Sequence, residues 1–309
     1  MKAYILRRML WVPVVLLVVS FVTFALGHYG PGDPVSVIAG QHRDPDVIAR
    51  ITEQRGLDDP FFIQYGRYIW NAIRGDLGES FTFRGEPVSS LIAGKIWVSA
   101  QLGIAATIIS VFGGVPLGLI AALNQGRWMD PVIVATTLIF VSVPVLVTAP
   151  LLALVFVVWL DILPSGGWGG FFDTRILMPA IVMGVPGIAI MTRLMRASTL
   201  DVLGQDYIRT ARAKGLREWT VRRRHIARNS VIPIVTVVGL SLGDLVTGAF
   251  ITERLYGIPG IGRLAVDSIF NRDYPVIMAL VLLIAVSFVL ANLLVDVLYA
   301  FLDPRIKYD

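Results

Sequence analysis

Long apolar runs constrain this chain more than any other feature of its sequence. About 20 apolar residues in a helix cross the hydrocarbon core of a bilayer, which is about 30 Å thick. The chain has 309 residues, of which 55% are hydrophobic and only 16% are charged. A soluble domain needs more charge on its surface than this. The sequence therefore predicts an integral membrane protein.

Six runs are long enough to cross a membrane. They span residues 9–27, 100–123, 131–160, 176–195, 231–251 and 276–301. The third run is unusually long and contains Pro144 and Pro150, and the fourth contains Pro186. Proline removes a helical hydrogen bond and favours a kink, which would suit a moving pathway but is also common in membrane helices. We expect an all-α integral membrane protein with six transmembrane helices.

Basic residues predict how these helices are oriented, because Lys and Arg concentrate in cytoplasmic loops. Lys2, Arg7 and Arg8 precede the first run, and the segment 206–233 carries eight Arg or Lys residues. We therefore expect both termini and this segment in the cytoplasm, and the loop 161–175 outside. A cleaved signal peptide is an alternative interpretation of the first run, because that run has a basic start and a small-x-small ending.

The region 29–97 is the only sizeable polar region and is expected outside the cell membrane. Asp44-Pro45 and Asp59-Pro60 predict two helix starts, with Gly56 and Gly75 as the corresponding ends. The second helix has apolar residues at helical spacing. It can lie on the membrane or dock on a partner, or it can simply cap the membrane helices. The predicted organisation is thus 1–28 with the first helix, 29–97 outside, and 98–309 as a five-helix core with the loop 204–229.

The motifs of common enzyme sites are missing from the sequence. Gly94-Lys95 is followed by Ile96, so it lacks the hydroxyl of a phosphate-binding loop. The histidines, His28, His42 and His225, form no H-E-x-x-H motif, and the chain has no cysteine. We expect no catalytic residue, no metal site and no cofactor in this chain, so that any ATP and Mg²⁺ would be bound by partner subunits.

The basic segment has its own predicted structure. A short helix over 207–214 should end at Gly215, a good residue for a helix C-terminus. The small residues Thr210, Ala211 and Ala213 would let this helix seat closely in a groove of another protein. The alternative is that the arginines only set the orientation and bind anionic lipid headgroups.

The same segment resembles the coupling loop of ABC-importer permeases. Their general pattern, E-A-A-x-x-x-G, is matched only by Ala211 and Gly215. The dipeptide/oligopeptide/nickel branch typically reads DYxRTARAKGL…RHxxRN, and this chain has 206–216 in that form, followed by Arg224-His225 and Arg228-Asn229. The resemblance extends to GLDDPFFIQYGRYIWNAIRGDLGESF at 56–81, ITERLYGIPGIGRL at 251–264 and DPRIKYD at 303–309.

This resemblance implies both a function and a set of partners. It implies a permease for di- or oligopeptides, assembled with a second homologous permease, two ATPase subunits and an extracytoplasmic binding protein in a bacterial or archaeal cell membrane. It also implies that the coupling loop contacts the ATPase through a defined set of residues: Tyr207, Arg209, Thr210, Ala211, Lys214, Gly215, Arg224, His225, Arg228 and Asn229.

A few polar residues within the apolar runs are candidates for the substrate pathway. Asp244 stands among glycines in the fifth run and could meet the amino group of a peptide, or it could pack at a subunit interface. Ser142 precedes Pro144 and could satisfy a carbonyl that the proline leaves free. Asn292 and Asp296 share one face of the last run, and we interpret them as structural.

Three classes of function remain open at this point. An ABC permease for peptides leads, with nickel or another small solute as variants on the same machinery. A channel or a stand-alone secondary transporter would need more polar residues along its helices. A membrane-anchored nucleic-acid binder would need more aromatic residues in the loop than Trp219 alone, so we expect no nucleic acid partner.

Overall fold

The computed structural model describes residues 2–29, 49, 52–53, 56, 58–83, 85–241 and 249–302, with the side chains of 2–9, 240 and 294–302 excepted. Every regular element within these ranges is a helix, and Glu79 and Pro87 form one isolated antiparallel bridge. The chain divides into two compact units. Unit 1 comprises 1–99, 246–250 and 259–309, and unit 2 comprises 100–245 and 251–258.

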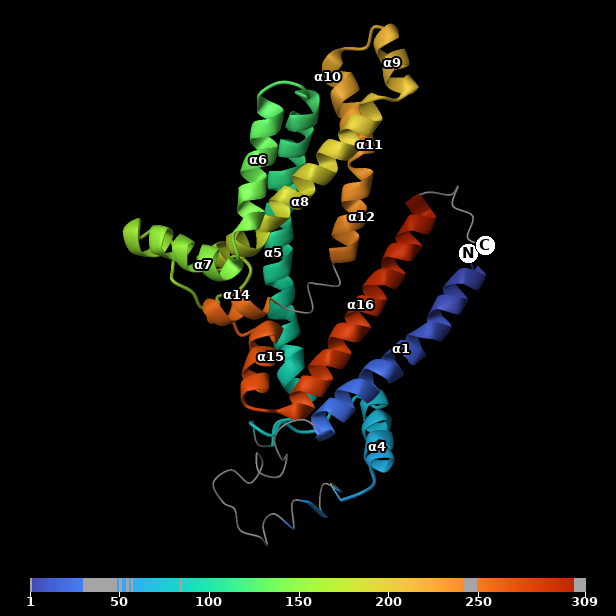
Figure 1. Cartoon of the computed structure of the whole chain (residues 1–309), viewed down its shortest axis with the longest axis vertical. Coiled ribbons are helices and arrows are strands. Elements are labelled where there is room, and N and C mark those ends of the chain that lie inside the picture. The colour runs from blue at the N-terminus through green and yellow to red at the C-terminus, as the bar shows by residue number, and fades with distance from the viewer. Residues whose placement is uncertain are drawn as a thin grey trace. The chain divides into compact units, whose positions relative to one another are not determined.

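Figure 1 shows the helices of both units. Unit 1 contains α1 (Lys2–Tyr29), α4 (Phe61–Ile73), the start of α5 (Val88–Leu123), α15 (Ile261–Phe270) and α16 (Tyr274–Leu302). Unit 2 contains the rest of α5, then α6 (Met129–Ser142), α7 (Val145–Ala153), the π-helix η1 (Leu154–Trp159), η2 (Thr174–Ile176) and α8 (Leu177–Leu203). It continues with α9 (Asp206–Ala213), α10 (Glu218–Thr220), the π-helix η3 (Val221–Ala227), α11 (Arg228–Ser230) and α12 (Ile232–Ser241), and it holds most of α14 (Phe250–Leu255).

The helices agree with most of the predicted membrane runs. Four of them are long and apolar enough to cross a bilayer: Leu10–Tyr29, Val88–Leu123, Thr174–Leu203 and Tyr274–Leu293. The pair Met129–Ser142 and Val145–Trp159 makes a fifth if its two bent helices count as one span. The first half of the fifth predicted run forms the apolar helix α12. Residues 242–248 of this run lie outside the described part of the chain. An all-helical membrane protein is therefore confirmed, and the count of six stays a prediction.

The third predicted run is broken rather than gently kinked. Its two helices meet at an angle of 97°, with Val143 extended and Pro144 at the start of α7. Pro144 has no N–H to continue α6, and it disfavours helical geometry in the preceding residue. The Ser142 hydroxyl donates to the Leu138 carbonyl at 2.9 Å. Pro144 leaves free the carbonyl four residues before it, which is that of Phe140. Ser142 bonds a different carbonyl, so the expectation that it satisfies the freed one is wrong.

The core of unit 2 depends on close contact between α5 and α8. A Cβ atom added to Gly114 would lie 2.5 Å from Met191 Cβ and 2.6 Å from the Ile188 carbonyl oxygen. At Gly118 it would lie 2.7 Å from Met195 Cβ and would overlap the Thr192 carbonyl. Small residues at such positions let membrane helices approach closely. Two side chains of this interface also form hydrogen bonds across it, from Ser110 to the Gly184 carbonyl at 2.8 Å and from Thr192 to the Gly114 carbonyl at 3.3 Å.

An ion pair joins α6 to α8 near the end of α8 that leads into the basic loop. Arg196 donates two hydrogen bonds to the carboxylate of Asp130, at 2.6 and 2.7 Å. Asp130 is only 6% exposed, so removing Arg196 would leave a carboxylate largely cut off from water. The pair fixes the first turn of α6 against α8.

Unit 1 holds the segment that follows α4 with a buried carboxylate. Asp273 is 1% exposed and accepts hydrogen bonds from the Ser80 hydroxyl and from the backbone N–H groups of Phe81 and Thr82. These contacts fix the chain that follows α4. The predicted helix after Asp59-Pro60 is confirmed as α4, whose Phe61 and Tyr65 pack against aromatic residues of α1. The helix predicted after Asp44-Pro45 lies outside the described residues.

The glycine contacts predict unequal effects of two alanine substitutions on α5. Gly118→Ala should lower the free energy of unfolding by about 1–3 kcal/mol, because its Cβ meets the backbone of α8. Gly94→Ala is the control, since a Cβ at this position meets nothing within 4 Å and alanine favours a helix. Thermal unfolding in detergent measures both. Equal midpoints for the two variants would contradict this packing.

Candidate functional site

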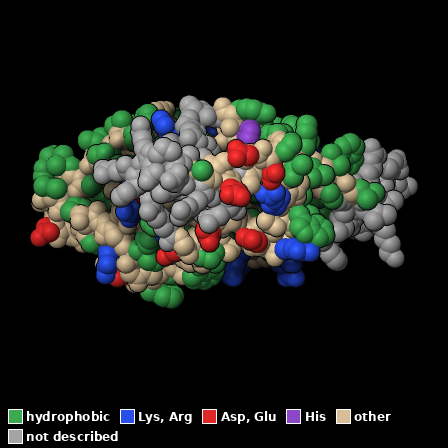
Figure 2. All heavy atoms as spheres, turned by 90° about the horizontal axis from the view of Figure 1, so that it is seen from below, with side chains coloured by type: hydrophobic (Ala, Val, Ile, Leu, Met, Phe, Trp, Pro, Cys, Tyr) green, Lys and Arg blue, Asp and Glu red, His purple; other side chains and the backbone are tan. Residues whose placement is uncertain are grey.

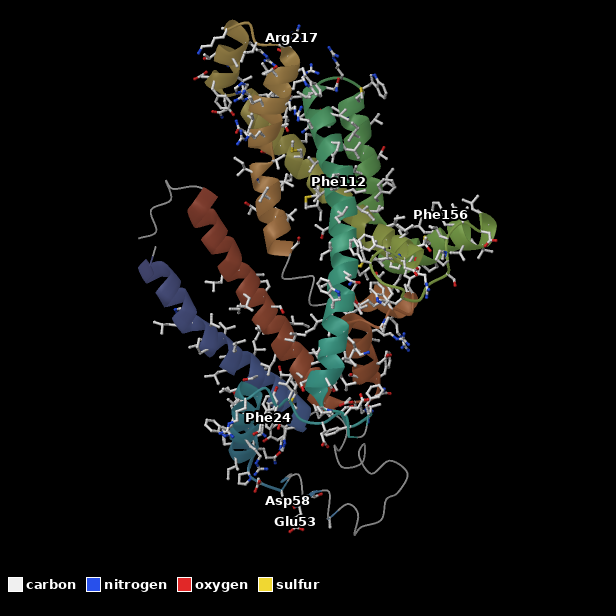
Figure 3. All side chains as sticks on the ribbon, turned by 180° about the vertical axis from the view of Figure 1, so that it is seen from behind. Phe24, Glu53, Asp58, Phe112, Phe156 and Arg217 are labelled. Carbon is white, nitrogen blue, oxygen red and sulfur yellow. The ribbon has the colours of Figure 1, made fainter. Side chains whose placement is uncertain are left out.

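The candidate site is the loop between α8 and α12, and its first element is the helix α9. The helix spans Asp206–Ala213, and Gly215 follows with a φ of +73°. The Gly215 N–H donates to the Arg212 carbonyl at 2.9 Å, and the Leu216 N–H donates to the Ala211 carbonyl at 3.3 Å. This backbone conformation is one that glycine adopts without strain. A short helix that ends at Gly215 is therefore confirmed. Figure 3 labels Arg217, in the turn that follows.

The inner face of α9 is bound to the rest of unit 2. Ile208 is fully buried and Ala211 is nearly so. They form a cluster with Val221 and Ile226 of the following segment, and four partly buried residues pack against it, Leu119 and Leu123 of α5 and Val202 and Leu203 of α8. The helix is thus attached directly to the ends of two long helices.

The structure corrects which face of α9 is free. The small-residue face expected to meet a partner included Ala211, which instead faces the core because it lies three residues after Ile208 on the same side of the helix. Thr210 and Ala213 are exposed. The other exposed residues of the helix are Asp206, Tyr207, Arg209 and Arg212, and the exposed Lys214 follows its end.

One side chain ties the start of α9 to the far end of the loop. The Asn229 side-chain amide donates to the Tyr207 hydroxyl at 3.0 Å and to the His225 carbonyl at 2.9 Å. Three predicted site residues thereby come together although 22 positions separate the first from the last. Sequence spacing alone does not predict this contact.

Charged pairs close the turn around Gly215. Arg212 donates to Glu218 at 2.9 Å, and Arg222 lies 3.8 Å from the same carboxylate. Arg209 pairs weakly with Asp206 at 3.4 Å. All of these side chains are substantially exposed, so each pair contributes little to stability. Arg212 and Glu218 face each other across the turn, and Glu218 is a residue that sequence reasoning missed.

The second half of the loop carries the remaining predicted residues on a different surface. Arg224 and Arg228 line a shallow pocket of about 400 Å³ together with Trp219, Thr220 and Arg223. No residue of α9 lines this pocket. The segment Val221–Ala227 is a π-helix, a form that appears often at functional sites and that has no clear signal in sequence.

The candidate pathway residues are only partly described. Ser142 ends α6 and is exposed. Asp244 and the side chain of Asp296 lie outside the part of the chain that the structure describes. Asn292 donates to the Phe288 carbonyl of its own helix at 2.8 Å.

The burial of Ile208 predicts that a smaller side chain at this position would loosen α9. Ile208→Ala should cost about 2–5 kcal/mol locally, because the side chain is fully buried. The loosened helix should be cut faster by trypsin at Arg209, Arg212 or Lys214. Leu216→Ala, which removes a 41% exposed side chain, is the control. Limited proteolysis of the purified chain checks this, and equal cleavage of both variants would show that the cluster does not hold α9.

Comparison with known proteins identifies the family. The model of binding-protein-dependent transport system inner membrane components matches residues 114–308, and the model of the N-terminal part of such components matches residues 1–92. The glutathione transport system permease proteins GsiC of Escherichia coli O6:H1 (strain CFT073), Salmonella paratyphi A and Escherichia coli K12 are each 41% identical over 308 residues, with 100% of both chains covered. A crystal structure of an amino acid ABC transporter with histidines has a TM-score of 0.49 at 16% identity and covers 71% of this chain and 95% of that chain. The chain belongs to the family of binding-protein-dependent transport system inner membrane components, the permeases of ABC importers.

Proposed function

We propose that this permease forms, with a homologous permease subunit, the path by which small peptides enter the cell. The observation that carries the proposal is the 41% identity, over the full length of both chains, to permeases of glutathione transport systems. Glutathione is a tripeptide, so di- and oligopeptides are the solute class that this likeness favours. The experiment that tests the class is identification of the solute retained by the cognate binding protein.

In this proposal, the loop passes the motion of an ATPase subunit to the membrane helices. Tyr207, Arg209, Thr210 and Lys214 are exposed and would make the contact. Ala211 supports them from the buried side, while Asn229 bonds Tyr207 and the His225 carbonyl. Because α9 packs on α5 and α8 residues, a force on its outer face acts on both long helices.

The remaining parts of the importer would be separate chains. ATP and Mg²⁺ would be bound by two ATPase subunits, and an extracytoplasmic binding protein would deliver the peptide. Figure 2 shows acidic side chains gathered in the view from below. In unit 1, the exposed carboxylates include Asp58, Asp76, Glu79 and Glu86. A binding protein with basic residues at its docking surface would suit them.

Nickel or another small solute is the second candidate, because the branch that the loop motif resembles includes nickel permeases. A stand-alone secondary transporter is disfavoured by family membership. Within the peptide proposal, Asp244 would face the pathway and attract cationic or zwitterionic substrates. Ser142, exposed at the break between α6 and α7, is a further candidate for the path.

The charge distribution predicts the orientation of the chain in the cell membrane, with both termini in the cytoplasm. The native sequence has no cysteine, so single cysteines report cleanly. Gly85→Cys should react with a membrane-impermeant thiol reagent in intact cells, because residues 29–97 are expected outside. Arg217→Cys should react only after the cells are opened. The reverse pattern would contradict this orientation.

The coupling role predicts a specific defect in Gly215→Val. A β-branched residue tolerates a φ of +73° badly, so the turn after α9 should be displaced. The transport rate should fall at least about tenfold, since a small misplacement of a positioned element lowers a rate by about that factor or more. Expression and membrane insertion should stay near normal, because no membrane helix is altered.

Gly126→Val provides the matched control. Gly126 has a φ of +78° and, like Gly215, would place a Cβ in open space, but it lies in the turn between α5 and α6. It therefore imposes similar strain outside the coupling loop. Uptake and binding-protein-stimulated ATPase activity should fail in Gly215→Val and survive in Gly126→Val. Normal coupling in Gly215→Val would show that the loop is not the coupling element.

A further inference from the structure

The second half of the loop gathers positive charge on a surface of its own. The pocket is lined by Trp219, Thr220, Arg223, Arg224 and Arg228, and this set is here called the arginine pocket. Arg223 and Arg224 lie four and five residues after Trp219, and Arg228 lies five and four residues after them. A π-helix closes its turns at five residues, so positions four and five apart come to one side of it. The unusual helix thus explains why three guanidinium groups share one pocket.

These guanidinium groups have no anionic partner in the described part of the chain. Arg223, Arg224 and Arg228 are exposed and take part in none of its ion pairs. The neighbouring carboxylate, Glu218, is occupied by Arg212 at 2.9 Å and faces Arg222 at 3.8 Å. Three like charges around one concave surface repel one another unless an anion lies between them. The described part of the chain therefore supplies no counter-charge to this pocket.

The position of the pocket along its helix indicates where that anion comes from. Arg228 precedes Ile232, the first residue of the apolar helix α12, by four positions, which corresponds to about 6 Å along a helix. The headgroup layer adds about 5–8 Å to each side of the hydrocarbon core. With Ile232 taken as the edge of the hydrocarbon core, Arg228 would lie at headgroup depth, and Arg224, about one turn further out, would reach back along its long side chain.

We propose that the arginine pocket binds the phosphate of an anionic lipid headgroup from the cytoplasmic leaflet. Guanidinium groups recognise phosphate with paired N–H donors, and the Thr220 hydroxyl supplies a further donor at the same pocket. The lipid anchors the second half of the loop at the membrane, while the outer face of α9 stays free. This assignment moves Arg224 and Arg228 from the predicted ATPase contact to a lipid site, and it does not depend on which solute is transported.

The test compares lipid retention by matched variants of the full complex. The complex is reconstituted in nanodiscs of phosphatidylcholine with a minority of phosphatidylglycerol, extracted, and its retained lipids are counted by mass spectrometry. The pocket variant is Arg223→Gln with Arg228→Gln. The control is Arg217→Gln with Arg222→Gln, which removes the same charge from exposed positions outside the pocket.

The wild type and the control should retain phosphatidylglycerol over phosphatidylcholine. The pocket variant should bind phosphatidylglycerol about 25-fold more weakly, since each lost arginine near an anionic surface accounts for about a fivefold change. Equal retention by the pocket variant and the wild type would overturn the proposal, and so would an equal loss in the control.

Two further outcomes identify other ligands. Inorganic phosphate in excess should leave the retained phosphatidylglycerol in place, and displacement would assign the pocket to a soluble phosphate instead. The ATPase subunits should copurify with the pocket variant. Their loss, with phosphatidylglycerol still bound, would make the pocket a protein interface and overturn the lipid assignment. The lipid measurements do not depend on coupling to the ATPase. They therefore still test the pocket if Gly215→Val fails to uncouple the ATPase.

Discussion

The close approach of α5 and α8 is the contact on which the rest of unit 2 depends. Gly114 and Gly118 place the backbone of α5 so near to α8 that a single added methyl group would overlap it. Buried hydroxyl groups bond carbonyls across the same interface, which adds polar contacts where a bilayer offers no water. The two helices are therefore closely packed, and their ends form the surface on which the cluster around Ile208 packs.

This arrangement gives the loop two different surfaces with two proposed partners. The outer face of α9 has exposed polar and basic side chains, and behind it lies a small apolar cluster anchored to both long helices. The arginine pocket lies on the neighbouring π-helix and contains no residue of α9. A loop that is held at the membrane by one surface can transmit force through the other, because its attachment resists displacement. The Asp130–Arg196 pair extends that attachment to α6, whose far end is the sharp break before α7.

Sequence reasoning succeeded where a single residue type fixes the local backbone. Gly215 ended α9 as expected, and Pro144 interrupted the third apolar run. The angle of that break, 97°, depends on how α7 packs, so the proline alone could not predict it. The direction of Ala211 was expected wrongly because small residues suit a core and a groove equally well. The bond from Asn229 to Tyr207 and the π-helix of η3 depend on tertiary contacts, and no spacing in the sequence encodes them.

The central claim is that the outer face of α9 touches the ATPase while its inner face holds the permease helices. Photo-cross-linking tests it most directly, with a benzophenone amino acid replacing the exposed Thr210. In a complex that still transports, irradiation should give an adduct between this position and an ATPase subunit, and addition of ATP should change its yield. Efficient cross-linking to lipid alone, with the ATPase present in the complex but absent from the adduct, would contradict the account.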